Sequence, residues 1–377
     1  MKKVLFYCMM PDPERGFNGA EIGSLVTYEL LKDKYDINIQ DVGTDDFNPF
    51  EKSWTHIKYN FKIFFHYILK YYKLRKKLKA NKYDIFYFVA ASSAKGHLRD
   101  VFTVMLARQY VNKIIAHNRN GNFAEIYKRK WHRKATNFFL RSVDKFIFLS
   151  DSLANEAKFF LPTHKITVAY NPVDKEIICS QAEILQKISK KNKRSELSIC
   201  YISNMIESKG YNDVAKACLI LKEKRFSRFK MNFIGRWNNL KDEKRFEEFI
   251  LSNNLDKYVN YIGKITDRNV LKEILLNADI FILPTYYPQE AQPRSIIEAL
   301  NAATPVITTN HASIPEMVTD KEQAIFVDKQ SPSQIADAIL QLDKMDVWIE
   351  YAKNARITFE EKFSYAAVVN QLIKAFS

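Results

Sequence analysis

The stretch IFILPTYYPQEAQPRSIIEAL, residues 280–300, carries the pattern of a strand, a loop and a helix in succession. The apolar run Ile280–Pro284 predicts a buried strand, and Ser295–Ala303 has apolar residues at helical spacing. Strands that alternate with helices form parallel sheets, and ligands bind such sheets at the carboxyl ends of the strands. We therefore expect an α/β fold with a ligand site in the loop that holds Glu290.

The residue types around this loop indicate a ligand with sugar and phosphate groups. Glu290 lies in the loop, Arg294 follows it, and Glu298 lies inside the helix. Carboxylates can bind sugar hydroxyls, and the N–H groups of a helix start, which Ser295 would cap, can bind a diphosphate. A pair of carboxylates can also be the acid and base of a hydrolase. The position of Glu298 inside a helix favours hydroxyl binding over protonation of a leaving group.

The same alternation runs through the whole chain and predicts two doubly wound α/β domains. The other strand-like runs are Lys3–Cys8, Ile85–Ala90, Lys113–Ala116, Lys145–Leu149, Leu197–Ser203, Lys230–Gly235, Tyr258–Gly263, Pro305–Thr309 and Ala324–Val327. A length of 377 residues suits two domains, which we expect at residues 1–180 and 181–377, facing a central cleft. The lysine-rich stretch Gln181–Glu196 would be a solvated linker or helix end. The last helix, within Val347–Phe376, would cross back to the first domain.

The composition excludes several classes of protein. Hydrophobic residues make up 47% of the chain and charged residues 27%, as is ordinary for a globular protein. The four cysteines form no C-x-x-C pair, which excludes a disulfide scaffold and a thiolate zinc site and suits the cytoplasm. The apolar run at the N-terminus ends at Pro11, too soon for a secretion signal, and no stretch has the length of a membrane span.

The net charge of +15 is concentrated in one part of the chain. Residues 51–150 hold 22 basic and 5 acidic residues, a net +17, whereas residues 1–50 carry −4 and the residues after 150 carry +2. Basic and aromatic residues are mixed along 57–78 and 127–141, as in helices that lie on anionic membranes. Alternatively, the aromatic side chains pack on the sheet and the lysines are merely solvated. No nucleic-acid-binding module is visible, so we expect an anionic membrane, and not nucleic acid, as the partner of residues 51–150.

Two turns that contain glycine could hold a phosphate group. Gly16, Gly19 and Gly23 follow the first strand, without the G-x-G-x-x-G spacing of a nicotinamide site. In the second half, Lys209 and Gly210 follow a strand and lead into a helix. A lysine there can reach an anionic oxygen as a flexible charge, whereas a cation at a helix start is otherwise unfavourable.

Together these features resemble the retaining GT-B glycosyltransferases of the large family 4. The family signature of two glutamates, an alanine and a Pro-Val-Ile strand is matched by Glu290, Glu298-Ala299 and Pro305-Val306-Ile307. Lys209-Gly210 matches the family's Lys-Gly turn, and the loop with Gly16 and Gly19 matches its glycine loop. His117 matches the histidine of the family's N-domain, and Asn171–Asp174 matches its Asn-Pro/Gly-Val-Asp turn. The resemblance covers nearly the whole chain. It implies two Rossmann-like domains, the first binding the acceptor and the second the nucleotide-sugar donor.

The resemblance also implies a role for each matching residue. Lys209 would hold the donor diphosphate and stabilise the departing nucleotide, Glu290 would face the donor sugar at the reacting centre, and His117 would lie near that sugar. Glu298 would accept hydrogen bonds from the ribose hydroxyls. The other residues expected around the donor are Gly16, Gly19, Asn204, Gly210, Arg236, Gly263, Ile265, Pro293, Arg294, Ser295 and Ile296. These enzymes usually need no bound metal, and we expect none here.

Three positions depart from the family's pattern. Asn204 stands where many relatives have an arginine, so one cation for the diphosphate is missing, and Arg294 or Arg236 would replace it. Pro293 and Ala303 stand where glycines are common. These changes leave the identity of the donor open.

The sequence therefore predicts a retaining hexosyltransferase that uses a UDP- or GDP-linked sugar. Its acceptor would be a glycan or a lipid-linked saccharide, in the synthesis of a surface polysaccharide such as O-antigen, capsule or lipopolysaccharide. The protein would be cytoplasmic and peripheral on the inner face of the cell membrane. Two alternatives stay open: another GT-B nucleotide-sugar enzyme, such as an epimerase, and an inactive GT-B partner subunit bound to the membrane.

Overall fold

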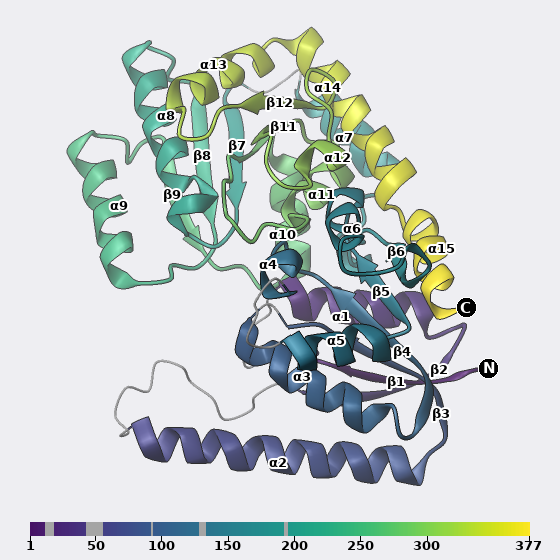
Figure 1. Ribbon diagram of the computed structural model, residues 1–377. Coiled ribbons are helices and arrows are strands. Elements are labelled where there is room, and N and C mark those ends of the chain that lie inside the picture. The colour runs from purple at the N-terminus through teal and green to yellow at the C-terminus, as the bar shows by residue number, and fades with distance from the viewer. Residues whose placement is uncertain (12–18, 43–55, 92, 128–132, 192–194) are drawn as a thin grey trace. The chain divides into compact units, whose positions relative to one another are not determined.

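The computed structural model describes residues 1–11, 19–42, 56–91, 93–127, 133–191 and 195–377, which form two α/β units (Figure 1). Unit 1 comprises Met1–Ala169 and Val369–Ser377, and unit 2 comprises Tyr170–Val368. The boundary between the units therefore lies between residues 169 and 170, about ten residues before the boundary at 180 that the sequence predicts. Asn171 and Asp174 explain the difference, because both bond to residues of unit 2.

Unit 1 is built on a parallel sheet of six strands in the order β2-β1-β3-β4-β5-β6. The strands are β1 (Lys3–Cys8), β2 (Asp36–Asp41), β3 (Tyr83–Val89), β4 (Val111–Asn118), β5 (Lys145–Phe148) and β6 (Ile166–Val168). The helices are α1 (Gly19–Leu31), α2 (His56–Ala80), α3 (Ala94–Ala107), α4 (Phe123–Tyr127), α5 (Arg133–Ser142) and α6 (Asp151–Ala157). The central strands are apolar over most of their length, as strands covered on both faces require.

Unit 2 repeats this plan with the strand order β12-β11-β10-β7-β8-β9, again parallel. The strands are β7 (Leu197–Ile202), β8 (Phe229–Ile234), β9 (Val259–Gly263), β10 (Ile280–Leu283), β11 (Val306–Thr309) and β12 (Ala324–Val327). The helices are α7 (Gln181–Lys191), α8 (Tyr211–Glu223), α9 (Leu240–Ser252), α10 (Arg268–Asn277), α11 (Arg294–Asn301), α12 (Ile314–Met317), α13 (Pro332–Leu342) and α14 (Met345–Thr358). Among the helices described in either unit, none is both long enough and apolar enough to cross a lipid bilayer.

The end of the chain returns to unit 1, as the sequence predicts. A π-helical turn, Phe359–Phe363, links α14 to the last helix, α15 (Tyr365–Phe376). Phe376 packs its ring against the rings of Phe6, Tyr35 and Tyr87, at centroid distances of 6.3, 5.4 and 5.6 Å. These apolar contacts explain why the last residues belong to unit 1.

The structure differs from two local predictions. The sequence does not reveal β2 and β6, because both are partly exposed edge strands that lack a continuous buried run. The stretch expected to be solvated forms α7, in which Lys187 is buried. Its Nζ donates to the carbonyl oxygens of Leu275 and Ala302 at 3.0 and 2.7 Å. Lys187 is therefore a structural residue that satisfies carbonyl groups at the ends of α10 and α11.

Candidate active site

The strand order of unit 2 selects one place for a ligand. Read from the other edge, it is β9-β8-β7-β10-β11-β12, so the chain direction across the sheet reverses between β7 and β10. Ligands of open α/β sheets bind at the carboxyl ends of the strands at such a reversal. The two loops that leave β7 and β10 there are the loops that carry Lys209 and Glu290.

The loop after β7 requires a glycine at position 210. A short 3-10 turn, Glu207–Lys209, ends at Gly210, whose φ of 82° is in the left-handed region. A Cβ atom at this position would lie 2.6 Å from the carbonyl oxygen of Pro284. The close approach joins the two loops, because the N–H of Tyr286 donates to the oxygen of Ser208 at 2.7 Å. Lys209 is thereby held at the start of α8.

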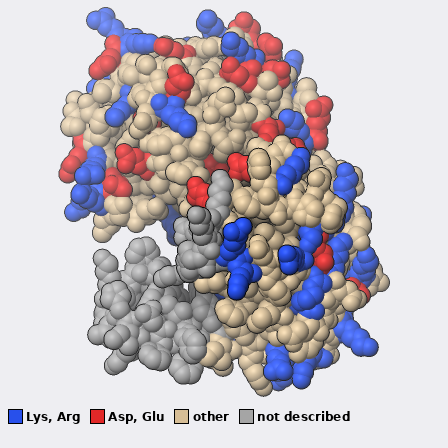
Figure 2. Space-filling view, viewed as in Figure 1, with Lys and Arg blue, Asp and Glu red and all other residues tan. Residues whose placement is uncertain are grey.

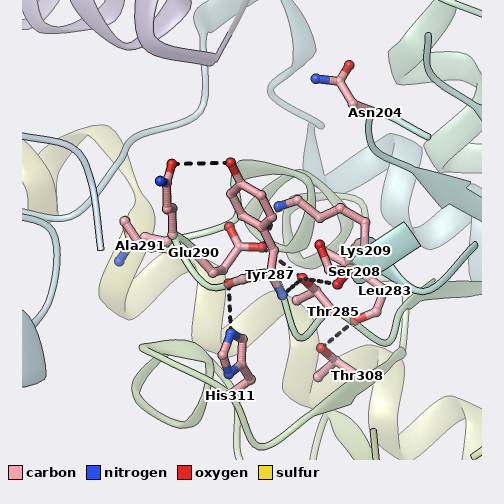
Figure 3. A network of polar contacts seen from close by, with 12 residues as sticks. Asn204, Ser208, Lys209, Leu283, Thr285, Tyr287, Glu290, Ala291, Thr308 and His311 are labelled. Carbon is pink, nitrogen blue, oxygen red and sulfur yellow. Dashed lines mark hydrogen bonds and ion pairs between the residues drawn. The ribbon is translucent and has the colours of Figure 1, made fainter. Parts of the chain in front are cut away.

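Lys209 and Glu290 form an ion pair (Figure 3). Nζ of Lys209 lies 2.5 Å from Oε2 of Glu290, and the side chains are only 13% and 7% exposed. Oγ1 of Thr285 also donates to Oε2 of Glu290 at 3.1 Å, and Nζ of Lys209 lies 4.8 Å from the centroid of the Tyr287 ring. The structure thus brings together two of the three predicted catalytic residues.

The loop of Glu290 is held from below by the end of β11 and the segment after it (Figure 3). Nε2 of His311 lies 2.8 Å from the carbonyl oxygen of Tyr287, so this nitrogen carries the proton and donates. Oγ of Ser313 donates to the oxygen of Ala291, and Oγ1 of Thr308 donates to the oxygen of Leu283 at 2.8 Å. These supporting residues cannot be identified from the sequence, because neither motif nor spacing links them to Glu290.

Glu298 is buried and belongs to a second ion-pair network. Nη2 of Arg268 donates to Oε1 of Glu298 at 2.7 Å, and Nε of Arg268 donates to Oδ2 of Asp174 at 2.7 Å. Burial lowers the pKa of Arg268, but the two carboxylates outweigh it, and the pKa is raised above its ordinary value. Asp174 comes from the Asn171–Asp174 turn, so Arg268 ties this turn to α11. Arg268 was not predicted, since the distance along the chain hides its relation to Glu298.

The start of α11 differs from the prediction in one respect. The helix begins at Arg294, and Pro293 is its N-cap residue and makes no side-chain cap hydrogen bond. Ser295 therefore lies inside the helix and is not its cap. The backbone N–H groups of the first turn, including that of Ile296, do not receive the predicted side-chain cap.

The other predicted donor residues are spread over both units. Gly263 ends β9 with a φ of 85°, and Ile265 packs on the core of unit 2. Arg236 is exposed, and Asn204 is exposed and lies apart from the Lys209–Glu290 network (Figure 3). Gly19 is the exposed first residue of α1 in unit 1, and Gly16 lies outside the described residues.

His117, the third predicted catalytic residue, ends β4 of unit 1 and is buried. Its Nδ1 lies 2.8 Å from the hydroxyl oxygen of Tyr87. Burial, and next the charge of Arg119, hold the pKa of His117 well below its ordinary 6.5. The imidazole is therefore neutral at neutral pH and can accept or donate one hydrogen bond at each nitrogen.

Comparisons with known proteins agree with this geometry. Residues 182–358 match the model of the family "Glycosyl transferases group 1". The putative colanic acid biosynthesis glycosyltransferase WcaL of Escherichia coli (strain K12) is 27% identical over 183 residues, 47% of this chain and 44% of the relative. The chain thus matches less than half the length of that relative. An uncharacterized 41.2 kDa protein in the cps region of Klebsiella pneumoniae is 23% identical over 80% of both chains.

The fold is shared along the whole chain with a solved structure, Anabaena Alr3699/HepE in complex with UDP and glucose. The TM-score is 0.74 at 14% identity, and the superposition covers 100% of this chain and 99% of the other. The chain has the GT-B fold, and its residues 182–358 match the family of group 1 glycosyl transferases.

Proposed function

We propose that this glycosyltransferase is a retaining hexosyltransferase that builds a surface polysaccharide. It takes a sugar from a nucleotide-sugar and transfers it to a glycan or a lipid-linked saccharide. The observation that carries the proposal is the pairing of Lys209 with Glu290 at the strand-order reversal, beside a helix start without a side-chain cap. The colanic acid enzyme among the relatives supports the polysaccharide, and the bound UDP of the structural neighbour supports UDP as the nucleotide over GDP.

The proposed chemistry follows from the charges of these groups. Before the donor binds, Lys209 and Glu290 neutralise each other. The donor diphosphate then binds the ammonium of Lys209, in place of Glu290, and the N–H groups at the start of α11. The carboxylate of Glu290 is released to face the sugar. Lys209 stabilises the negative charge that grows on the departing nucleotide, and Glu298 binds the ribose hydroxyls.

Turnover of a panel of nucleotide-sugars, with and without a saccharide acceptor, tests the proposal. The transferase consumes donor only when acceptor is present, and Glu290→Ala abolishes this turnover. Isomerisation of the donor without acceptor would identify an epimerase instead. A folded protein that turns over no donor would be an inactive partner subunit. A thermal-shift screen with UDP, GDP, ADP and CMP identifies the nucleotide, because a ligand that binds the folded state raises the unfolding midpoint.

An anionic membrane is the second proposed partner, through α2 and α3 of unit 1. The hydroxyl of Tyr71 donates to the backbone oxygen of Arg99 at 2.9 Å and joins these two helices, which lie side by side (Figure 1). Large apolar side chains point outward from them: Ile68, Leu69, Tyr72, Phe102 and Met105 are 45, 59, 66, 54 and 46% exposed. Exposed basic residues of α2 are Lys73, Arg75, Lys76 and Lys79.

Part of this basic stretch packs within unit 1. Leu74 and Leu78 are buried against the sheet, and Nζ of Lys77 donates to the oxygen of Ile39 at 2.7 Å. The other face combines apolar and basic groups. Figure 2 shows basic side chains over unit 1 with few acidic ones, whereas both signs are mixed over unit 2. Such a surface suits anionic lipid head groups, at about 1 kcal/mol for each basic residue near the membrane.

Sedimentation with vesicles of anionic lipid at rising salt tests the membrane proposal. We expect binding at low salt that weakens as salt rises, and reduced binding of the variant in which Leu69 and Tyr72 are both serine. Vesicles of neutral lipid are the control. No sedimentation with anionic vesicles at low salt would overturn the proposal and would leave the transferase proposal intact.

A further inference from the structure

Arg119 is an arginine of unit 1 without an assigned role. It directly follows β4, and its Nη2 donates to the oxygen of Gly23 and to Oγ1 of Thr27, both at 2.8 Å. The same nitrogen lies 3.5 Å from the hydroxyl of Tyr87 and 3.4 Å from Nδ1 of His117. The guanidinium is thus held in one position by α1, β3 and β4.

The missing side chain of Gly23 makes room for this guanidinium. A Cβ atom at position 23 would lie 1.4 Å from Nη1 of Arg119, so Nη1 occupies the space that any other residue would fill. Gly23 lies inside α1, where glycine is less favourable than alanine by about 1 kcal/mol. The helix therefore carries a glycine where only the fit of Arg119 requires one.

The charge of Arg119 has no carboxylate within ion-pair distance among the residues that the structure describes. Its four hydrogen-bond partners are a carbonyl oxygen, two hydroxyls and an imidazole whose lowered pKa keeps it neutral. Nε and Nη1 are buried and donate to no partner among the residues that the structure describes. Two other arginines of unit 1 are paired: Arg99 with Asp100 at 2.8 Å and Arg108 with Asp144 at 2.5 Å. Arg119 thus differs from both by lacking an anion, which an enclosed cation requires.

The position of Arg119 matches that of a ligand site. The strand order of unit 1 reverses between β1 and β3, and α1 follows β1 while Tyr87 lies on β3. Arg119 reaches these two elements from the carboxyl end of β4, the next strand of the sheet. Ligands of doubly wound sheets bind at the carboxyl ends of the strands at this reversal. We propose that Arg119, seated in the space left by Gly23, binds a phosphate group of a substrate next to His117.

Two substrates could supply this phosphate, namely the diphosphate of the donor and a phosphate of a lipid-linked acceptor. The choice of substrate rests on the proposed function, but the phosphate site itself does not.

Binding measurements on the full chain test the site without relying on activity. Isothermal titration calorimetry with UDP and with inorganic pyrophosphate would compare the wild type with Arg119→Gln and Arg119→Lys. A charge-assisted hydrogen bond to phosphate corresponds to about a tenfold or greater change in affinity. We expect at least that loss of affinity for both probes in Arg119→Gln and a partial loss in Arg119→Lys. The control Lys158→Gln, which removes an exposed charge from the same unit, should change neither affinity.

Gly23→Ala provides a second variant that keeps the charge. The added methyl group displaces the guanidinium from its position, whereas alanine is favourable in a helix, so the variant should fold and yet bind phosphate more weakly. If UDP affinity is unchanged but the KM for a phosphate-bearing acceptor rises at least tenfold, the acceptor is the source of the phosphate. If folded Arg119→Gln and Gly23→Ala bind both probes and the acceptor like the wild type, the proposal is wrong. A wild type that binds pyrophosphate through Arg119 but transfers no sugar would contradict only the proposed function.

Discussion

Nζ of Lys209 lies 2.5 Å from Oε2 of Glu290, although 81 positions separate the two residues in the chain. Both side chains are largely withdrawn from water, so each charge depends on the other. We expect Lys209→Met to lower the free energy of unfolding by about 3–5 kcal/mol, because it leaves the buried carboxylate of Glu290 without its partner.

The double variant Lys209→Met/Glu290→Gln is the matched comparison. It removes both charges together, so the loss of stability should be smaller than in Lys209→Met alone. Urea unfolding of the wild type, both single variants and the double variant measures this coupling. A loss in the double variant equal to the sum of the losses in the two single variants would show that the pair is not coupled.

Arg268 should be a positioning residue for Glu298. Arg268→Met leaves Glu298 and Asp174 as two unpaired acids, and we expect a loss of stability of about 3–5 kcal/mol. Arg268→Lys should be more stable than Arg268→Met, because it keeps the charge. One ammonium cannot reproduce the fixed geometry in which two nitrogens of the guanidinium bond Asp174 and Glu298.

Binding of UDP and 2′-deoxy-UDP separates this positioning role from a purely structural one. The wild type should prefer UDP, Glu298→Ala should lose the preference, and Arg268→Lys should weaken it several-fold. If Arg268→Lys keeps the full preference for the ribose, Arg268 does not position Glu298.

The buried His117 should make stability depend on pH. Its folded-state pKa lies well below 6.5, the ordinary value that applies after unfolding, so only the unfolded chain takes up the proton just below pH 6.5. Stability is therefore lost as pH falls from about 6.5 towards the folded pKa, at up to about 1.4 kcal/mol per pH unit. His117→Asn should have a flatter profile in thermal unfolding from pH 5 to 8. An unchanged slope in this variant would assign the pH dependence to other groups.

Gly210 and Gly263 provide a matched pair of backbone substitutions. Both have φ near +80°, at 82° and 85°, so alanine costs about 1–2 kcal/mol of backbone strain at either position. Only at position 210 does the new Cβ also meet an atom, the carbonyl oxygen of Pro284 at 2.6 Å. Gly210→Ala should therefore be clearly more destabilising than Gly263→Ala in thermal unfolding. Equal losses would mean that the two loops separate easily.

Removal of divalent metal should leave the transfer reaction unchanged. In the proposed mechanism the ammonium of Lys209 and the helix start of α11 supply the positive charge at the diphosphate. Turnover in EDTA should then equal turnover in Mg²⁺ or Mn²⁺. A tenfold or larger loss in EDTA that is restored by one of these ions would require a metal at the diphosphate instead.

Much of the fold could be predicted because its causes are local. The apolar run at Ile280–Pro284 and the helical spacing of Ser295–Ala303 identify a strand and a helix without any knowledge of their neighbours. The sequence did not predict β2, because β2 is an edge strand and an edge strand needs no continuous apolar run. Lys187 was expected in solvent because composition does not reveal which lysine will meet the ends of two helices.

The sequence by itself determined the alternation of strands and helices, the Lys209-Gly210 turn and the two glutamates. It could do so because hydrophobic periodicity and glycine's backbone freedom act over a few residues. The folded chain alone reveals that Lys209 pairs with Glu290 and that Arg268 holds Glu298. It alone reveals that Arg119 lies beside Gly23 with no acid paired to it among the described residues. These contacts depend on which strands become neighbours. That choice is made by packing between elements far apart in the chain, and no spacing in the sequence records it.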